Sequence, residues 1–173
     1  MLFRSRLFVT EDPEGGKRGQ AFAAAVLDCA YDDVRLRSIN DPNPIDVSAW
    51  AGGGMVLAVE VKQLVVDEST ALVLAKDAAG NGCDRALLVA LHPAQPHFDR
   101  EHIRHEALVN HGVLVEACAS VEELVARVLI GSRLPLTDAA IRIQEWYSAR
   151  MAEHGLADES RERWASLCEG LGI

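Results

Sequence analysis

The sequence predicts a three-layer α/β domain, with a mixed β-sheet flanked by helices. Segments in which apolar and polar residues alternate are interspersed with longer segments of helical character, the pattern of a sheet covered by helices. A glycine-rich turn at 51–54 joins two strand-like segments into a hairpin, and the nearly continuous apolar run at 85–91 is typical of a central, doubly covered strand. With 49% hydrophobic residues, we expect a single domain over 1–173, with its core at about 17–131 and a helical extension at about 137–170.

The first half of the chain is predicted to contain one helix followed by three strands. Residues 21–31 form an alanine-rich apolar run with high helix propensity, which indicates a mostly buried helix. Residues 34–39 alternate like a strand, and the turn-forming residues 40–44 make the loop after it. Two further alternating segments, 45–50 and 57–62, are the strands of the hairpin.

The second half is predicted to alternate helices with strands. Acidic and hydroxyl residues at 67–70 open one helix, and the capping box Ser120-Val121-Glu122-Glu123 opens another. The expected elements are, in chain order, a helix at 67–79, a strand at 85–91, a helix at 99–110, a strand at 113–117, a helix at 120–129, and amphipathic helices at about 137–153 and 158–169. The last two helices carry tryptophans that could pack on the core or form a dimer surface.

The hairpin is predicted to bring three charged side chains to one place. With the turn centred on its middle glycine, Asp46 pairs with Glu60 and Trp50 pairs with Val56, unless a bulge shifts the register by one. Lys62 lies two residues beyond Glu60 and therefore points to the same face of the strand. Two acids and one amine would thus lie close together.

Opposed carboxylates on neighbouring strands repel each other, so the pair formed by Asp46 and Glu60 needs a compensating positive charge. Mg²⁺ would supply it, because this ion takes only one or two protein carboxylates and fills its other positions with water and phosphate oxygens. Lys62 could then hold a water or stabilise charge on a phosphate. The alternative is that all three side chains form the solvated face of an ordinary sheet, with an ion pair worth about 0 to 1 kcal/mol.

In these residues and in the order of its elements, the chain resembles the PD-(D/E)xK nuclease superfamily. The αβββαβ core of that superfamily carries an Asp at the start of its second strand and Glu-x-Lys in its third. Asp46 and Glu60-Val61-Lys62 match these positions within a likeness that covers about residues 17–118. Ile45 stands directly before Asp46 and the proline is one position earlier, at Pro44, so the literal Pro-Asp dipeptide is missing.

Three segments are also similar to type II restriction endonucleases of the SacI kind, namely Arg18-Gly19-Gln20-Ala21-Phe22, Asn40-Asp41-Pro42 and Glu60-Val61-Lys62-Gln63. The resemblance implies a restriction-endonuclease-like fold and a Mg²⁺-dependent DNA endonuclease that acts in restriction or defence. It also implies that Asp46, Glu60 and the carbonyl of Val61 bind Mg²⁺, for which Mn²⁺ could substitute. Lys62 would orient or help deprotonate the attacking water, and the products would be a 5′-phosphate and a 3′-hydroxyl.

Several polar residues near the predicted site are candidates for contacts with DNA phosphates: Lys17, Arg18, Gln20, Arg35 and Arg37. Lys17 and Arg18 precede a helix, where backbone N–H groups and the helix dipole favour an anion, although this segment could equally be a solvated loop. Arg35 and Arg37 share the outward face of the first strand. Double-stranded DNA is the expected partner, and loops, a homodimer or a partner subunit would have to supply specificity, because no familiar reading module is present.

The net charge of −9, with a sequence pI of about 5.1, argues against DNA binding. Residues 1–40 hold six basic and six acidic residues, residues 41–100 four and eight, and residues 101–173 seven and twelve. The excess of acidic over basic residues therefore lies outside residues 1–40. It favours a second hypothesis, a catalytically inactive nuclease-fold subunit or protein-binding module. A small-molecule α/β domain would need a glycine-rich phosphate loop after the first strand, and none follows it.

Histidines and cysteines allow further expectations. Five histidines fall within a short stretch of the chain: His92, His97, His102, His105 and His111. We expect them to lie at the surface, and the alternative is a shared metal site. The four cysteines have no C-x-x-C spacing and lie in or beside apolar segments, which is typical of reduced thiols. The chain shows no signal segment and no apolar run of about 18 residues, so we expect a cytoplasmic protein without a membrane partner.

Overall fold

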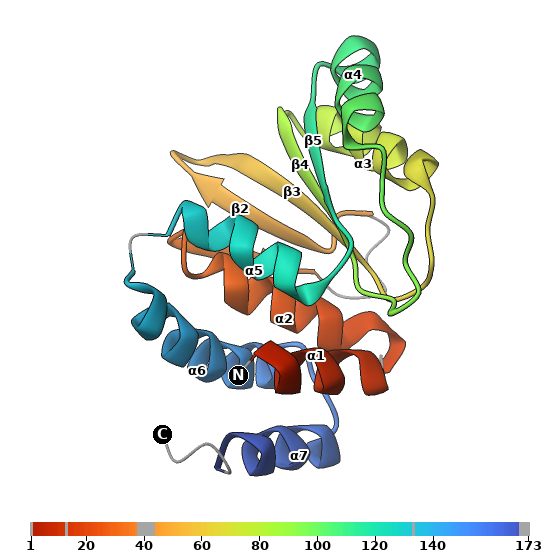
Figure 1. Ribbon diagram of the computed structural model, residues 1–173. Coiled ribbons are helices and arrows are strands. Elements are labelled where there is room, and N and C mark those ends of the chain that lie inside the picture. Colours follow the sequence, from red (N-terminus) through yellow and green to blue (C-terminus); the bar gives the residue numbers. More distant parts are fainter. Residues whose placement is uncertain (1, 13, 38–43, 133, 170–173) are drawn as a thin grey trace.

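A five-stranded mixed sheet lies between two groups of helices in the computed structural model, which describes residues 2–12, 14–37, 44–132 and 134–169 (Figure 1). The strands lie side by side in chain order: β1 (Asp33–Leu36), β2 (Val47–Ala51), β3 (Gly54–Lys62), β4 (Arg85–Ala90) and β5 (Leu114–Cys118). The first three strands are antiparallel neighbours, whereas β3, β4 and β5 run parallel. The predicted α/β class with a mixed, helix-flanked sheet is confirmed.

Helices cover both faces of the sheet (Figure 1). On one face lie α3 (Glu68–Gly80) and α4 (Arg100–His111). On the other side lie α1 (Leu2–Glu11), α2 (Lys17–Leu27), α5 (Val121–Ile130), α6 (Leu136–Glu153) and α7 (Asp158–Glu169). In Figure 1, α2 and α5 lie against the sheet, and α1, α6 and α7 lie beyond them, so the C-terminal helices add to this layer.

Alternation along the strands divides the core in two, because successive side chains point to opposite faces. Val59 and Leu87 belong to the cluster on the α2 side, whereas Ala58 and Leu88 belong to the cluster under α3 and α4. Glu60 continues the Ala58 side of β3. A charged residue is therefore inserted at the edge of an apolar layer.

The hairpin register agrees with the prediction up to residue 49. Val47 pairs with Val59, and the ladder then continues in step until a bulge between Ala49 and Trp50 shifts it. Trp50 consequently pairs with Met55, so the predicted partner Val56 is wrong by one position. The two turn glycines at 52 and 53 have φ angles of 59° and 82°, which glycine adopts without steric cost. The bulge lies near the turn, so it leaves the end of the hairpin that carries the acids unshifted.

Tertiary packing extends the fold at both ends of the chain. Helix α1 was not predicted from the sequence, and its Phe8 and Val9 are fully buried. The ring of Phe8 packs against Tyr147 of α6 and Trp164 of α7, at centroid distances of 6.1 and 5.4 Å. The two C-terminal helices therefore pack on the core through these aromatic residues, which decides between the two alternatives for the tryptophan of α7.

Three further expectations concern the first strand with its loop, the cysteines and membrane-spanning helices. The first strand ends at Leu36, and most of the predicted 40–44 loop lies outside the described residues. The four cysteines form no disulfide among the described residues; three of them are buried and Cys168 is half-buried. Among the helices that the structure describes, none combines the length and the apolar character required to cross a bilayer.

Candidate active site

The three side chains predicted to converge are adjacent at the end of β3. Asp46 lies directly before β2, where its backbone carbonyl accepts a hydrogen bond from the Arg37 N–H at 3.0 Å. Its carboxylate oxygen Oδ2 accepts another from the Val61 N–H at 2.7 Å. Lys62 Nζ forms an ion pair with Glu60 Oε1. The hairpin thus brings both acids and the amine to one end of the sheet.

Burial of the two acids perturbs their protonation. Glu60 is only 7% exposed, and its Oε2 atom is buried without a hydrogen-bond partner among the described residues. Burial, and after it the nearby Asp46 carboxylate, raise the pKa of Glu60 to about 7, although Lys62 opposes both. Burial also raises the pKa of Asp46, although the Val61 N–H and the Lys62 charge oppose this. Glu60 is therefore only partly ionised near neutral pH.

The cluster reaches solvent through its other two members. The side chain of Lys62 is 38% exposed, and Asp46 is half-buried. Burial disfavours the Lys62 ammonium, but the contact with Glu60 and the charge of Asp46 outweigh it and raise the pKa of Lys62. A protonated amine therefore lies at the surface beside two acids that are less exposed than it is.

A glutamine from α2 completes the cluster. The Gln20 side chain hydrogen-bonds to the Asp46 carboxyl, and its Oε1 lies 2.6 Å from Nε2 of His154, which follows α6. An ionised carboxylate only accepts hydrogen bonds, so the Gln20 amide donates to Asp46 and its oxygen accepts from the His154 ring. Burial and the charge of Lys17 lower the pKa of His154, which favours the neutral ring, and the contact with Gln20 Oε1 then requires the hydrogen on Nε2. Sequence reasoning missed His154 because nothing in its spacing links it to the hairpin.

Close packing of α2 on β3 depends on Gly19. A Cβ atom at this position would lie 3.1 Å from Val61 Cγ1 and 3.1 Å from Gln63 Cδ, closer than most Cβ contacts. The Gln63 amide in turn donates to the backbone carbonyl of Val9 at 2.6 Å. Glycine at position 19 therefore lets the helix that carries Gln20 approach the strand that carries Glu60.

Two residues expected to face DNA are instead buried inside the protein. Arg18 is 4% exposed and donates to the Phe8 carbonyl at 3.1 Å and to Ser160 Oγ at 2.7 Å. Gln20 is 6% exposed, and its side chain is hydrogen-bonded to Asp46 and to the histidine after α6. The first turn of α2 packs against the aromatic core formed by α1, α6 and α7. The side chains of Arg18 and Gln20 are therefore not available to contact DNA phosphates.

The remaining phosphate candidates lie nearer the surface. Lys17 donates to a backbone carbonyl in the α6–α7 connection at 3.0 Å. Arg35 is exposed, forms a two-point ion pair with Asp33 at 3.0 and 2.7 Å, and stacks 4.2 Å above the Trp50 ring. Arg37 is half-buried beside the backbone of Asp46. Because Arg35 is already paired with Asp33, Lys17 and Arg37 are the better placed of the three to meet an anion from solvent.

The two carboxylates of the cluster, Asp46 and Glu60, are a donor set that Mg²⁺ could use. In the described part of the chain, no group of three or more His, Cys, Asp or Glu side chains could hold a metal, and the clustered histidines form no such group. Structural zinc and calcium sites use more protein ligands, whereas Mg²⁺ binds through one or two carboxylates and keeps water in its other positions. A divalent cation would also pair the buried Oε2 of Glu60 and offset the repulsion from Asp46.

Three elements thus contribute to the candidate site: the residue preceding β2, the end of β3, and the first turns of α2. Its chemistry is that of two acids, one exposed amine and a buried amide that orients one of the acids. Among known proteins, neither a family model nor a curated sequence matches the chain.

Proposed function

We propose that this chain is a Mg²⁺-dependent endonuclease that hydrolyses phosphodiester bonds in double-stranded DNA, on a restriction-endonuclease-like fold. The observation that carries the proposal is the convergence of Asp46, Glu60 and Lys62 at one end of the sheet, with a buried, unpaired oxygen on Glu60. The order α2, β1, β2, β3, α3, β4 agrees with the αβββαβ core of the PD-(D/E)xK superfamily. A role in restriction or defence follows from that resemblance.

Asp46 and Glu60 would hold the Mg²⁺ ion, with the Val61 carbonyl as a backbone ligand. The bound ion would polarise the scissile phosphate and lower the pKa of a water molecule. Lys62 extends toward solvent from the same strand face as Glu60, so its ammonium can hydrogen-bond a water or a phosphate oxygen. Because its pKa is raised, Lys62 acts in this proposal as a donor that orients the water and not as the base that deprotonates it.

Protonation of Glu60 links activity to pH. With a pKa of about 7, a large fraction of Glu60 carries a proton at neutral pH in the absence of a cation. Cation binding requires the ionised carboxylate and therefore releases this proton. We expect the apparent affinity for Mg²⁺, and with it cleavage at limiting Mg²⁺, to rise as the pH increases through about 7.

The alternative function is a catalytically inactive nuclease-fold subunit or protein-binding module. The net charge of −9 favours it, because DNA binding depends on neutralising phosphates. The burial of Arg18 and Gln20 favours it too, since it leaves Lys17, Arg35 and Arg37 as the phosphate candidates. Under this alternative, the purified chain cleaves no nucleic acid with any divalent cation.

The deciding experiment incubates the purified protein with supercoiled plasmid, with and without Mg²⁺, beside a Lys62→Ala variant. Deleting one stabilising group of this kind lowers the rate on the order of 10²- to 10³-fold in other enzymes. Lys76→Ala is the matched control, because Lys76 is an exposed lysine on α3 and not on the strand that carries Glu60 and Lys62, and it should cleave like the wild type. Equal cleavage by Lys62→Ala and Lys76→Ala would refute the assigned role, and no Mg²⁺-dependent cleavage by the wild type would favour the subunit alternative.

A further inference from the structure

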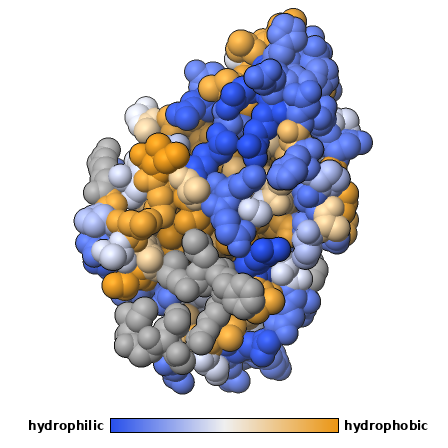
Figure 2. All heavy atoms as spheres, viewed as in Figure 1, coloured by the Kyte–Doolittle hydropathy of each residue, from blue (hydrophilic) through white to orange (hydrophobic). Residues whose placement is uncertain are grey.

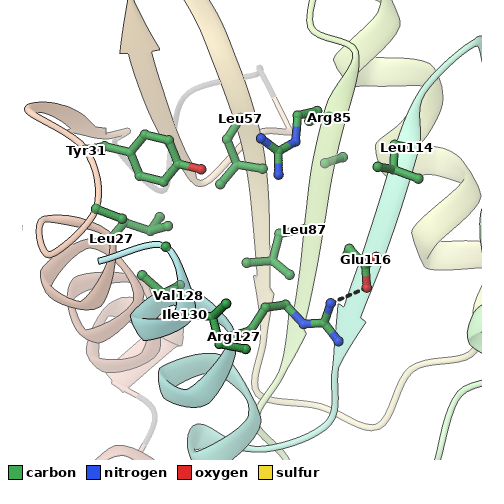
Figure 3. A pocket seen from close by; sticks show the side chains of 13 residues that line it. Leu27, Tyr31, Leu57, Arg85, Leu87, Leu114, Glu116, Arg127, Val128 and Ile130 are labelled. Atoms are coloured by element: carbon green, nitrogen blue, oxygen red, sulfur yellow. Dashed lines mark hydrogen bonds and ion pairs between the residues drawn. The ribbon is translucent and has the colours of Figure 1, made fainter. Parts of the chain in front are cut away.

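A cavity of about 430 Å³ opens at the end of the sheet opposite to Asp46 and Glu60 (Figure 3). It lies on the α2 and α5 side, where β4 and β5 begin, and is bounded by the C-terminal ends of those two helices. The candidate active site is at the other end of β3. The cavity is therefore a separate feature, and its role does not depend on the proposed endonuclease activity.

The walls of the cavity are mainly apolar. Leu57 and Leu87 from the sheet and Val128 from α5 line it with little exposure, at 7%, 4% and 8%. At its rim, Leu114 is 42% exposed and Ile130 is 88% exposed. Figure 2 shows apolar residues gathered where α5 ends beside the β2–β3 hairpin. An apolar body seated in the cavity would remove these side chains from water.

Polar groups enter the cavity from two sides. In Figure 3, the Tyr31 hydroxyl and the Arg85 guanidinium point toward each other across the space. Among the residues that the structure describes, Arg85 takes part in no ion pair, whereas the lining acid Glu116 is occupied by Arg104 and Arg127. The one acid in the lining is thus neutralised, and the free charge that faces the cavity is positive.

We propose that this cavity binds a small amphipathic anion, a carboxylate or a phosphate monoester attached to an apolar body. Its volume lies within the range of about 300 to 1,000 Å³ typical of ligand pockets, and a few convergent polar groups on apolar walls are the usual composition of such pockets. The oxyanion pairs with Arg85, with Tyr31 as a second donor. The apolar body packs on Leu57, Leu87 and Val128.

The test titrates nitrogen-15-labelled protein with phenylbutyrate, phenyl phosphate and, as the uncharged control, phenylbutanol, and follows the backbone amides by NMR. We expect shifts centred on Leu87 and Val128, with phenylbutanol bound about tenfold more weakly than the better anion, because it forfeits one charge-assisted hydrogen bond. The tighter of the two anions identifies the head group. Shifts centred elsewhere, no shifts with either anion, or equal affinity for the alcohol would each overturn the proposal.

A pair of variants tests whether the charge of Arg85 binds the anion. Arg85→Gln removes the cation from an exposed position and should weaken anion binding about tenfold while leaving phenylbutanol unchanged. Arg142→Gln, an exposed arginine on α6, is the matched control and should bind like the wild type. Both variants should retain any plasmid cleavage, which separates this proposal from the active site. Unchanged anion affinity in Arg85→Gln would refute it.

Discussion

Replacing Glu60 with glutamine is expected to stabilise the fold above neutral pH while abolishing cleavage. The substitution keeps the size and shape of the side chain and removes its charge. In the folded protein Glu60 is 7% exposed and close to the Asp46 carboxylate, so ionisation is unfavourable there in the absence of a cation. Glutamine stays neutral at every pH and avoids this cost.

The size of the effect follows from the pKa of Glu60. That pKa rises from 4.5 to about 7 on folding, so the folded protein holds the proton more tightly than the unfolded chain does. Its contribution to stability is therefore fully present below about pH 4.5 and is lost as the pH rises through about 7, a total of about 3 kcal/mol. This total already includes the favourable contact with Lys62, because that contact contributes to the pKa of about 7. The variant should therefore be about 3 kcal/mol more stable than wild type at pH 8.

The assay is urea unfolding at several pH values from 5 to 8, without divalent cations, followed by circular dichroism. Wild type should lose stability relative to the variant across this range, and the two should converge at the acid end. Glu162→Gln, at an exposed position on α7, is the matched control and should parallel wild type. Addition of Mg²⁺ at ten times its dissociation constant should stabilise wild type by about 1.4 kcal/mol and leave Glu60→Gln unchanged.

Two results would refute this reasoning. A Glu60→Gln variant less stable than wild type at pH 8 would show that the buried carboxylate is well accommodated in the absence of a cation. Mg²⁺ stabilisation that persists in the variant would show that the cation binds elsewhere. The first result removes the electrostatic argument and the second removes the proposed metal site.

Three other changes test how neighbouring elements support the site and the core. Gln20→Leu removes the hydrogen bonds to Asp46 and His154 and should lower the cleavage rate at least about tenfold, while costing about 1 to 3 kcal/mol by urea unfolding because these buried polar partners lose Gln20; an unchanged cleavage rate without urea would contradict this role. Gly19→Val forces a branched side chain against Gln63 and should destabilise the protein by about 1 to 3 kcal/mol, and a stability equal to wild type would show that α2 can move away. Trp164→Ala should cost about 3 to 5 kcal/mol by urea unfolding, because this ring is 3% exposed in the aromatic core; a loss under about 1 kcal/mol would mean that α7 is dispensable.

Periodicity and turn chemistry along the chain were enough to predict the sheet, its hairpin and the meeting of Asp46 with Glu60. Strand alternation has a period of two, so once a glycine turn sets the register, the face and the partner of each residue follow. The bulge at Ala49 and Trp50 was not predictable, because it depends on how the hairpin twists as it packs. The same local rules placed Lys62 beside Glu60.

The sequence by itself thus determined the class of fold, the order of its central elements and the composition of the acid–amine cluster, since all of these depend on spacing along one hairpin. Only the tertiary structure decided that α1 and α7 join the core, that Arg18 is buried, and that Gln20 of α2 reaches Asp46 and is itself contacted by His154, which follows α6. Such contacts depend on how helices dock, and docking is governed by side-chain packing between distant segments, which leaves no regular period in the sequence.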